Sequence, residues 1–124
     1  MDFTPSRELV LKKLHDCFPD AAIAREALAV LDTYGIENWH REKERVQLAL
    51  LKISAGNLDK LRLRTNGARL DYRDTLMPAE FHEQSQASSN TPPQEMEVLR
   101  RRDREEYEKW LESGGAEARH YSSR

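Results

Sequence analysis

The sequence predicts an all-α protein, a small bundle of about four helices with a central antiparallel helical hairpin (residues 40–78) and a loosely attached C-terminal helix. Two observations lead to this fold class. Apolar residues recur at the three-and-four spacing of one helical face through most of the first two-thirds of the chain, and no stretch alternates in the manner of a strand. Each run of this pattern is bounded by a proline, a glycine or a side chain that can cap a helix end. With 124 residues, the chain is long enough for one domain with a modest core.

Proline and glycine delimit the first two helices. Thr4 and Pro5 have the form of a helix start, with Thr4 as the N-cap. Pro19 ends the first helix, because the residue before a proline is disfavoured in the helical region. An alanine-rich second helix follows over residues 21–34 and ends at Gly35. These two helices are expected to form half of a bundle that spans residues 4–78.

The hairpin is the most regular part of the sequence, and it joins two helices at residues 54–57. Gly56 can adopt the positive φ that closes a helix C-terminus, and Asn57 can accept a hydrogen bond from the first free N–H groups of the next helix. The second arm contains Gly67 in mid-helix, where glycine costs about 1 kcal/mol relative to alanine. The apolar residues keep their phase across this glycine. The second arm is therefore predicted to be one continuous helix as far as Pro78.

Both arms carry a second apolar line, on the back of the face that already holds an apolar stripe. This line comprises Leu48 and Leu51 on the first arm and, at intervals of seven residues on the second arm, Leu63, Leu70 and Met77. A helix covered on one side only does not need such a line. Either other helices of the same chain cover it, or a second copy of the protein does. These residues are therefore a possible partner interface, and a homodimer is one of the two outcomes that the pattern predicts.

The part of the chain after residue 81 is polar and highly charged, and we expect it to lie outside the bundle. The expected divisions are a bundle domain (1–81), a flexible linker (82–91), a charged amphipathic helix (92–112) and a disordered tail (113–124). Thr91 and the two prolines that follow it have the form of a helix start. The apolar stripe of that helix is thin and is interrupted around Asp103, which predicts loose attachment.

Composition and charge limit the classes of protein to consider. Charged residues make up 34% of the chain and the formal net charge is −2, so no overall field draws the protein toward nucleic acid or a membrane. Residues 41–81 hold nine basic against six acidic side chains, whereas the flanking segments are net acidic. No N-terminal apolar run resembles a signal peptide or a membrane anchor, and the single cysteine, Cys17, cannot form an internal disulfide. We expect a cytoplasmic protein without a membrane partner, in which Cys17 is a small buried side chain.

The short connection between the second and third helices carries Trp39 and His40. Trp39 is expected to be a lid over the helix ends, since an indole seldom remains wholly exposed. His40 and Glu44 are four residues apart, a spacing that could place two metal ligands on one helical face. Two ligands are too few for a metal site. The sequence therefore predicts no metal ion and no cofactor.

No group of residues in the sequence specifies a reaction. Asp71 and Asp74 place two carboxylates three residues apart beside Arg73, which could suggest acid–base chemistry. Because Tyr72 belongs to the core stripe, its charged neighbours are better explained as solvated or ion-paired side chains. No nucleophile motif or glycine-rich phosphate loop accompanies them. We therefore expect a protein that is not an enzyme and has no catalytic residue.

Three arginines, Arg62, Arg69 and Arg73, fall close together on one side of the second hairpin arm, between its two apolar lines. Such an arc could contact phosphates, which makes weak nucleic-acid binding an alternative function. Acidic neighbours dilute the positive charge, and no aromatic residue is interleaved for base stacking. The sequence therefore favours a protein partner over nucleic acid.

Four short motifs lie in the predicted bundle. They are Asp32-x-Tyr34-Gly35, Glu44-Arg45-Val46-Gln47-Leu48-Ala49, Lys52-x-Ser54-x-Gly56-x-Leu58-x-Lys60-Leu61 and Asp71-Tyr72-Arg73-Asp74. Together they resemble a family of small bacterial all-helical proteins over residues 5–83. No established activity, cofactor or catalytic residue is associated with that family, so the resemblance implies a helical bacterial protein and no particular reaction. We predict a small protein–protein interaction module whose partner the sequence does not identify.

Overall fold

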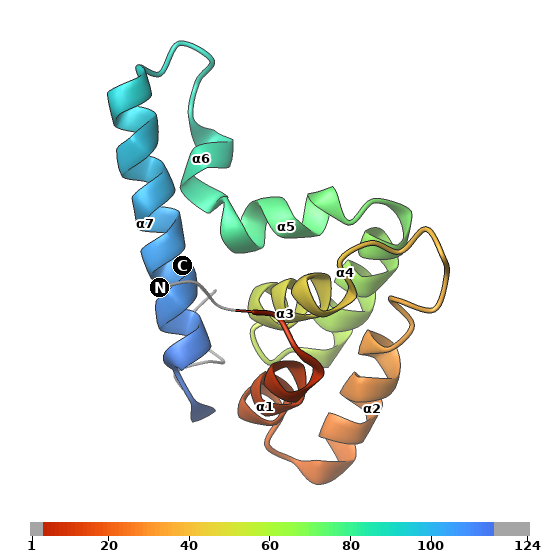
Figure 1. The fold of residues 1–124 in the computed structure, drawn as a ribbon. Helices are drawn as coiled ribbons and strands as arrows, with labels where there is room; N and C mark the ends of the chain where they lie inside the picture. The colour runs from red at the N-terminus through yellow and green to blue at the C-terminus, as the bar shows by residue number, and fades with distance from the viewer. Residues whose placement is uncertain (1–3, 116–124) are drawn as a thin grey trace.

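The computed structural model describes residues 4–115, and these residues form seven helices and no strand. The helices are α1 (Arg7–Cys17), α2 (Ala21–Leu31), α3 (Lys43–Ser54), α4 (Leu58–Leu70), α5 (Arg73–Glu80), α6 (His82–Gln86) and α7 (Pro93–Glu112). The all-α fold class is therefore confirmed. In Figure 1, α3 lies among α1, α4 and α5, against which it packs, and α7 runs along one side of the molecule. Residues 116–124 of the predicted disordered tail lie outside the described residues.

The ends of the first two helices are set by side-chain hydrogen bonds. Ser6 rather than Thr4 caps α1, and its Oγ accepts a hydrogen bond from the backbone N–H of Leu9 (3.2 Å). α2 ends at Leu31, earlier than predicted, and the buried Gln47 binds the end of that helix. Its Nε2 donates to the carbonyl oxygen of Leu31 at 3.2 Å. The same oxygen also accepts a hydrogen bond from the backbone N–H of Tyr34 at 3.1 Å, so Gln47 adds a second donor at the end of α2.

A three-residue turn joins α3 to α4. Ala55 and Gly56 have positive φ values of 49° and 76°, which close α3. Asn57 Oδ1 accepts a hydrogen bond from the backbone N–H of Lys60 at 2.9 Å and so caps α4. α4 then continues through Gly67 without a break.

The second arm does not extend to Pro78 as one helix, because it breaks at Asp71. The backbone of Asp71 is extended (φ −153°, ψ 104°), and its Oδ1 accepts a hydrogen bond from the N–H of Arg73 at 3.0 Å. Aspartate side chains that bind nearby backbone N–H groups compete with helix formation, which explains the break. Met77 therefore lies on α5, on a different helix from Leu70.

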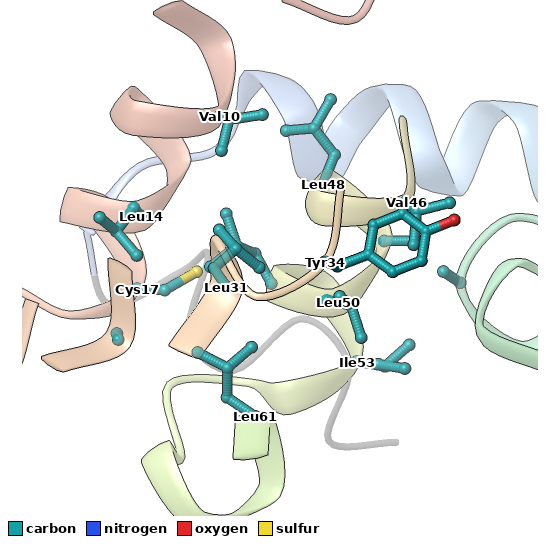
Figure 2. Packing of buried hydrophobic residues seen from close by; sticks show 14 of the residues in the cluster. Val10, Leu14, Cys17, Leu31, Tyr34, Val46, Leu48, Leu50, Ile53 and Leu61 are labelled. Atoms are coloured by element: carbon teal, nitrogen blue, oxygen red, sulfur yellow. The ribbon is translucent and has the colours of Figure 1, made fainter. Parts of the chain in front are cut away.

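The core is built around α3. Every residue from Val46 to Ser54 is buried, because helices pack against α3 on several sides. Figure 2 shows apolar side chains from α1, α2, α3 and α4 meeting around Leu31. Cys17 is buried in this cluster, as predicted.

The C-terminal half of α7 belongs to the same core, which corrects the prediction of a loosely attached helix. The Trp110 side chain is fully buried. Lys13 on α1 is also fully buried, and its Nζ donates hydrogen bonds to the carbonyl oxygens of Trp110 (2.6 Å) and Ser113 (2.8 Å). The Lys13 ammonium lies 4.6 Å from the centroid of the Trp110 ring. The prediction failed because a lysine is ordinarily taken to be solvated, whereas here it satisfies the end of a distant helix.

The segment predicted to be a flexible linker contains α6. The buried carboxylate of Asp103 on α7 accepts hydrogen bonds from the backbone N–H groups of Glu83 (2.9 Å) and Gln84 (3.0 Å), at the start of α6. A carboxylate at this position satisfies N–H groups that have no partner within the helix. The gap at Asp103 in the apolar stripe therefore does not loosen α7, because Asp103 binds α6.

A bidentate ion pair ties α1 to the end of α2. Arg7 Nη1 donates to Asp32 Oδ1 at 2.6 Å, and Nη2 donates to Oδ2 at 2.8 Å. These hydrogen bonds lower the pKa of Asp32 below its ordinary value. The folded state therefore binds a proton at Asp32 less readily than the unfolded chain does. The stabilisation from this pair is present above about pH 4, the ordinary aspartate pKa, and is lost as the pH falls through the lower folded pKa.

We expect Asp32→Asn to lower the free energy of unfolding at neutral pH by about 1 kcal/mol or less, because both partners are more than a third exposed. The difference from wild type should be smaller at about pH 3, below the ordinary aspartate pKa of about 4, where the unfolded chain binds a proton at this position. Urea denaturation at both pH values measures the difference in the free energy of unfolding between wild type and variant. Asp74→Asn, at an exposed position, is the control. An equal difference at both pH values would contradict the linkage.

Candidate interaction surface

The residues predicted for a partner interface separate into a buried and an exposed group. Leu48 and Leu51 are fully buried in α3, so they are not available to a partner, and the prediction is wrong for these two. The physical reason is that other helices of the same chain surround α3. Leu63, Leu70 and Met77 are 70%, 91% and 43% exposed. These three residues remain candidates for contact with a partner.

The outer face of α4 is an apolar strip that the described chain leaves uncovered. Leu63, Gly67 and Leu70 occupy positions i, i+4 and i+7, which lie on one side of a helix. A Cβ atom added at Gly67 would meet no atom within 4 Å, so the space beside the helix is open there. We call these three residues the α4 outer face.

A hollow of about 290 Å³ opens beside Leu70, between the end of α4 and the connection from α2 to α3. It is lined by Tyr34, Trp39, His40, Ala68, Arg69, Leu70, Asp71, Tyr72 and Arg73. We call it the Trp39 hollow. It brings together Leu70, predicted for a protein partner, with Arg69 and Arg73, predicted for nucleic acid.

The loop wall of the Trp39 hollow is held in place by Tyr34 and His40. Tyr34 is buried, its Oη donates to the carbonyl oxygen of Arg41 at 2.6 Å, and its ring stacks on His40 with the centroids 4.6 Å apart. Burial raises the pKa of Tyr34, so the phenol remains a neutral donor. His40 Nδ1 accepts a hydrogen bond from the backbone N–H of Gly35 at 2.9 Å. These contacts fix the loop without a helix or strand.

Trp39 is not the lid that the sequence predicted. Its side chain is 61% exposed, and its ring meets the edge of His40 at a centroid distance of 5.6 Å. Tyr34, and not Trp39, belongs to the core cluster. Trp39 therefore stands at the rim of the hollow as a site residue that sequence reasoning missed. The available signal was an indole in a short connection between two predicted helices, outside the apolar stripe of either helix.

The His40 and Glu44 pair does not form part of a larger ligand set. His40 Nδ1 is already bound to the backbone of its own loop. Within residues 4–115, no three or more histidine, cysteine, aspartate or glutamate side chains are grouped so that they could hold a metal ion.

Two of the three arginines predicted to contact phosphates form ion pairs within the chain. Arg62 pairs with Asp59 at 3.3 Å and with Glu26 at 3.4 Å, and Arg73 pairs with Asp71 at 3.0 Å. Arg69 lines the Trp39 hollow. Because nearby carboxylates already offset two of the three charges, the arc is a poor phosphate-binding set, and nucleic-acid binding stays a prediction without added support.

The paired aspartates do not resemble an acid–base site. Asp71 lines the Trp39 hollow, whereas Asp74 is exposed on α5 and does not line it. Hydrogen bonds from Arg73 lower the pKa of Asp71. Asp71 therefore stays ionised and serves as a cap for the start of α5, which is a structural role.

Comparisons give no relative from which a role for this surface could be transferred. Within the described part of the chain, no helix has both the length and the apolar character needed to cross a membrane. Comparison with protein-family models, with curated proteins and with solved structures finds no match. The family resemblance stays a prediction, and a functional proposal has to rest on the geometry of the surface itself.

Proposed function

We propose that the protein is a small non-enzymatic protein-binding module whose copies pair through the α4 outer face and the adjoining Trp39 hollow. The observation that carries this proposal is the 91% exposure of Leu70. Single exposed apolar residues are common on proteins, but Leu70 adjoins Leu63 on one side and the exposed Trp39 across the hollow. Tryptophan, tyrosine and arginine, which all line this hollow, are the residue types that contribute most to binding at protein interfaces.

A second copy is the partner that fits this face best, because the face is complementary to itself. If two α4 helices pack antiparallel about a two-fold axis near Gly67, Leu63 of one copy lies beside Leu70 of the other. Gly67 allows close approach of the two helices, since it has no side chain and the space beside it is open. A net charge of −2 adds little repulsion between copies.

The expected association is weak. Stable dimers bury about 800 Å² on each partner, which is more than a few apolar side chains supply. We therefore expect a dissociation constant on the order of 10 μM. Such a dimer forms and separates with concentration, so oligomeric state has to be measured over a range of concentrations.

Leu70→Glu should abolish this pairing, because it places a charge at the centre of the apolar contact in both copies. Sedimentation velocity over about 5 to 500 μM should show the wild type passing from monomer to dimer and the variant remaining a monomer. The variant should keep the wild-type circular dichroism spectrum, since Leu70 is 91% exposed. Val98→Glu, at a 42% exposed position on α7, is the matched control and should still dimerise. A wild type that stays monomeric throughout would exclude the pairing.

A cross-link tests the antiparallel register directly. Gly67→Cys places a thiol beside the proposed two-fold axis, and mild oxidation should yield a disulfide-linked dimer if the two Cα atoms come within about 7 Å. Ala22→Cys, exposed on α2, is the control and should remain monomeric. Cys17 is buried and does not compete. Equal cross-linking of both variants would contradict the proposed register.

A further inference from the structure

A second hollow, of about 340 Å³, lies between α4 and α7 and shares no lining residue with the Trp39 hollow. It is lined by Lys52, Ile53, Lys60, Arg64, Pro78, His82, Glu83, Arg102, Asp103 and Glu106. We call it the α4–α7 hollow. Its volume falls in the range of small-molecule sites, about 300–1,000 Å³.

The acidic side chains of the α4–α7 hollow are already bound. The carboxylate of Asp103 accepts two backbone N–H groups at the start of α6, at 2.9 and 3.0 Å. Glu106 pairs with the buried ammonium of Lys52 at 3.0 Å. Glu83 lies 3.6 Å from Arg102. Each carboxylate of the lining therefore already has a partner within the protein.

Two cations of the hollow have no such partner. Lys60 and Arg64 are exposed on α4, and neither forms an ion pair with any described residue. They are four residues apart, so they stand next to each other on one face of the helix. Like charges at this spacing destabilise a helix, and neither cation forms an ion pair with a described residue that would offset this repulsion. Arg102 and Lys52 also line the hollow, and both are already paired with carboxylates of the lining.

We infer that the α4–α7 hollow binds the phosphate group of a small organic molecule. Lys60 and Arg64 supply the positive charge, and the planar Arg64 guanidinium can bind two phosphate oxygens at once. Ile53 and Pro78 supply an apolar wall against which the rest of the molecule can pack. A bound phosphate would also remove the repulsion between Lys60 and Arg64, so binding should stabilise the fold.

This site shares no residue with the proposed dimer face. Lys60 and Arg64 lie beside the α4 outer face, about 60° and 100° around the helix from Leu63, because successive residues of a helix are rotated by about 100°. Loss of self-association in Leu70→Glu should leave phosphate binding unchanged. Failure of one proposal therefore does not entail failure of the other.

Titration of the ¹⁵N-labelled full chain with sodium pyrophosphate at constant ionic strength tests the site. Backbone amide shifts should saturate with a dissociation constant of about 1 mM or tighter, and the largest shifts should fall near Lys60, Arg64 and Arg102. Lys60→Gln and Arg64→Gln should each weaken binding about tenfold, since each removes a charged hydrogen-bond donor. Both positions are exposed, so the variants should fold as the wild type does.

Two further measurements separate a phosphate site from general attraction of anions. Arg25→Gln removes the same charge from an exposed position on α2 and should leave the affinity unchanged. Citrate at the same concentrations should bind more weakly than pyrophosphate if the site selects phosphate. The proposal is overturned by shifts that do not saturate, by an Arg25→Gln effect as large as that of Arg64→Gln, or by citrate binding as tightly as pyrophosphate.

Discussion

Replacing Trp110 with alanine should lower the free energy of unfolding by about 3–5 kcal/mol, the range for removing a buried large aromatic side chain. The indole is fully buried and lies in the cluster that includes α1 and α3. Its removal would leave a cavity beneath the ammonium of Lys13, whose Nζ lies 4.6 Å from the ring centroid. Urea denaturation followed by far-ultraviolet circular dichroism measures the change.

The matched control on the same helix is Val98→Ala. Val98 is 42% exposed and lies on the N-terminal half of α7, outside the core cluster. Its replacement should change stability by about 0.5 kcal/mol or less. If both substitutions had the same small effect, α7 would be the loosely attached helix that its sequence suggests.

The second large effect is expected from Lys13→Met, at about 2–4 kcal/mol of lost stability. Methionine keeps much of the side-chain volume but donates no hydrogen bond, so the carbonyl oxygens of Trp110 and Ser113 lose the donor that Lys13 supplies at 2.6 and 2.8 Å. Burial lowers the pKa of Lys13, and the nearby Asp16 carboxylate acts in the opposite direction. The measurement is urea denaturation combined with hydrogen exchange, in which the amides at the end of α7 should lose protection first.

Lys12→Met is the control for Lys13→Met. Lys12 is the adjacent residue, its side chain is 58% exposed, and its ion pair with Asp16 at 3.1 Å lies at the surface. Its loss should cost about 0.5 kcal/mol or less. Lys13 and Trp110 are in contact. A chain that carries both Lys13→Met and Trp110→Ala should therefore lose less stability than the sum of the losses in the two single variants. Strict additivity would mean that the lysine and the indole act separately.

The features that were predicted well depend on residues close together in the sequence. Gly56 and Asn57 mark the turn between α3 and α4 because a positive φ and an N-cap require only local chemistry. The burial of Cys17 and the continuity of α4 through Gly67 follow from helical periodicity, which is also local. The exposed positions Leu63 and Leu70 were recognised as a separate apolar line for the same reason.

The features that were missed depend on residues far apart in the sequence. Lys13, Gln47 and Asp103 are polar, and sequence patterns place such side chains in solvent. Each instead binds the backbone at the end of a helix, and the donor or acceptor it meets could not be identified without the fold. Leu48 could not be assigned to the core until α3 was known to be surrounded. The break at Asp71 was missed because the apolar pattern continues across it.

The contact between Lys13 and Ser113 also sets the order in which the domain can be completed during synthesis. The two residues are separated by 100 positions, so α1 leaves the ribosome long before its partner on α7 exists. At about 5–20 residues per second, the interval is about 5–20 s. During this interval the Lys13 ammonium remains in water and the apolar surface that receives Trp110 remains open. The final docking of α7 therefore occurs only after Ser113 has emerged, and until then the domain is incomplete.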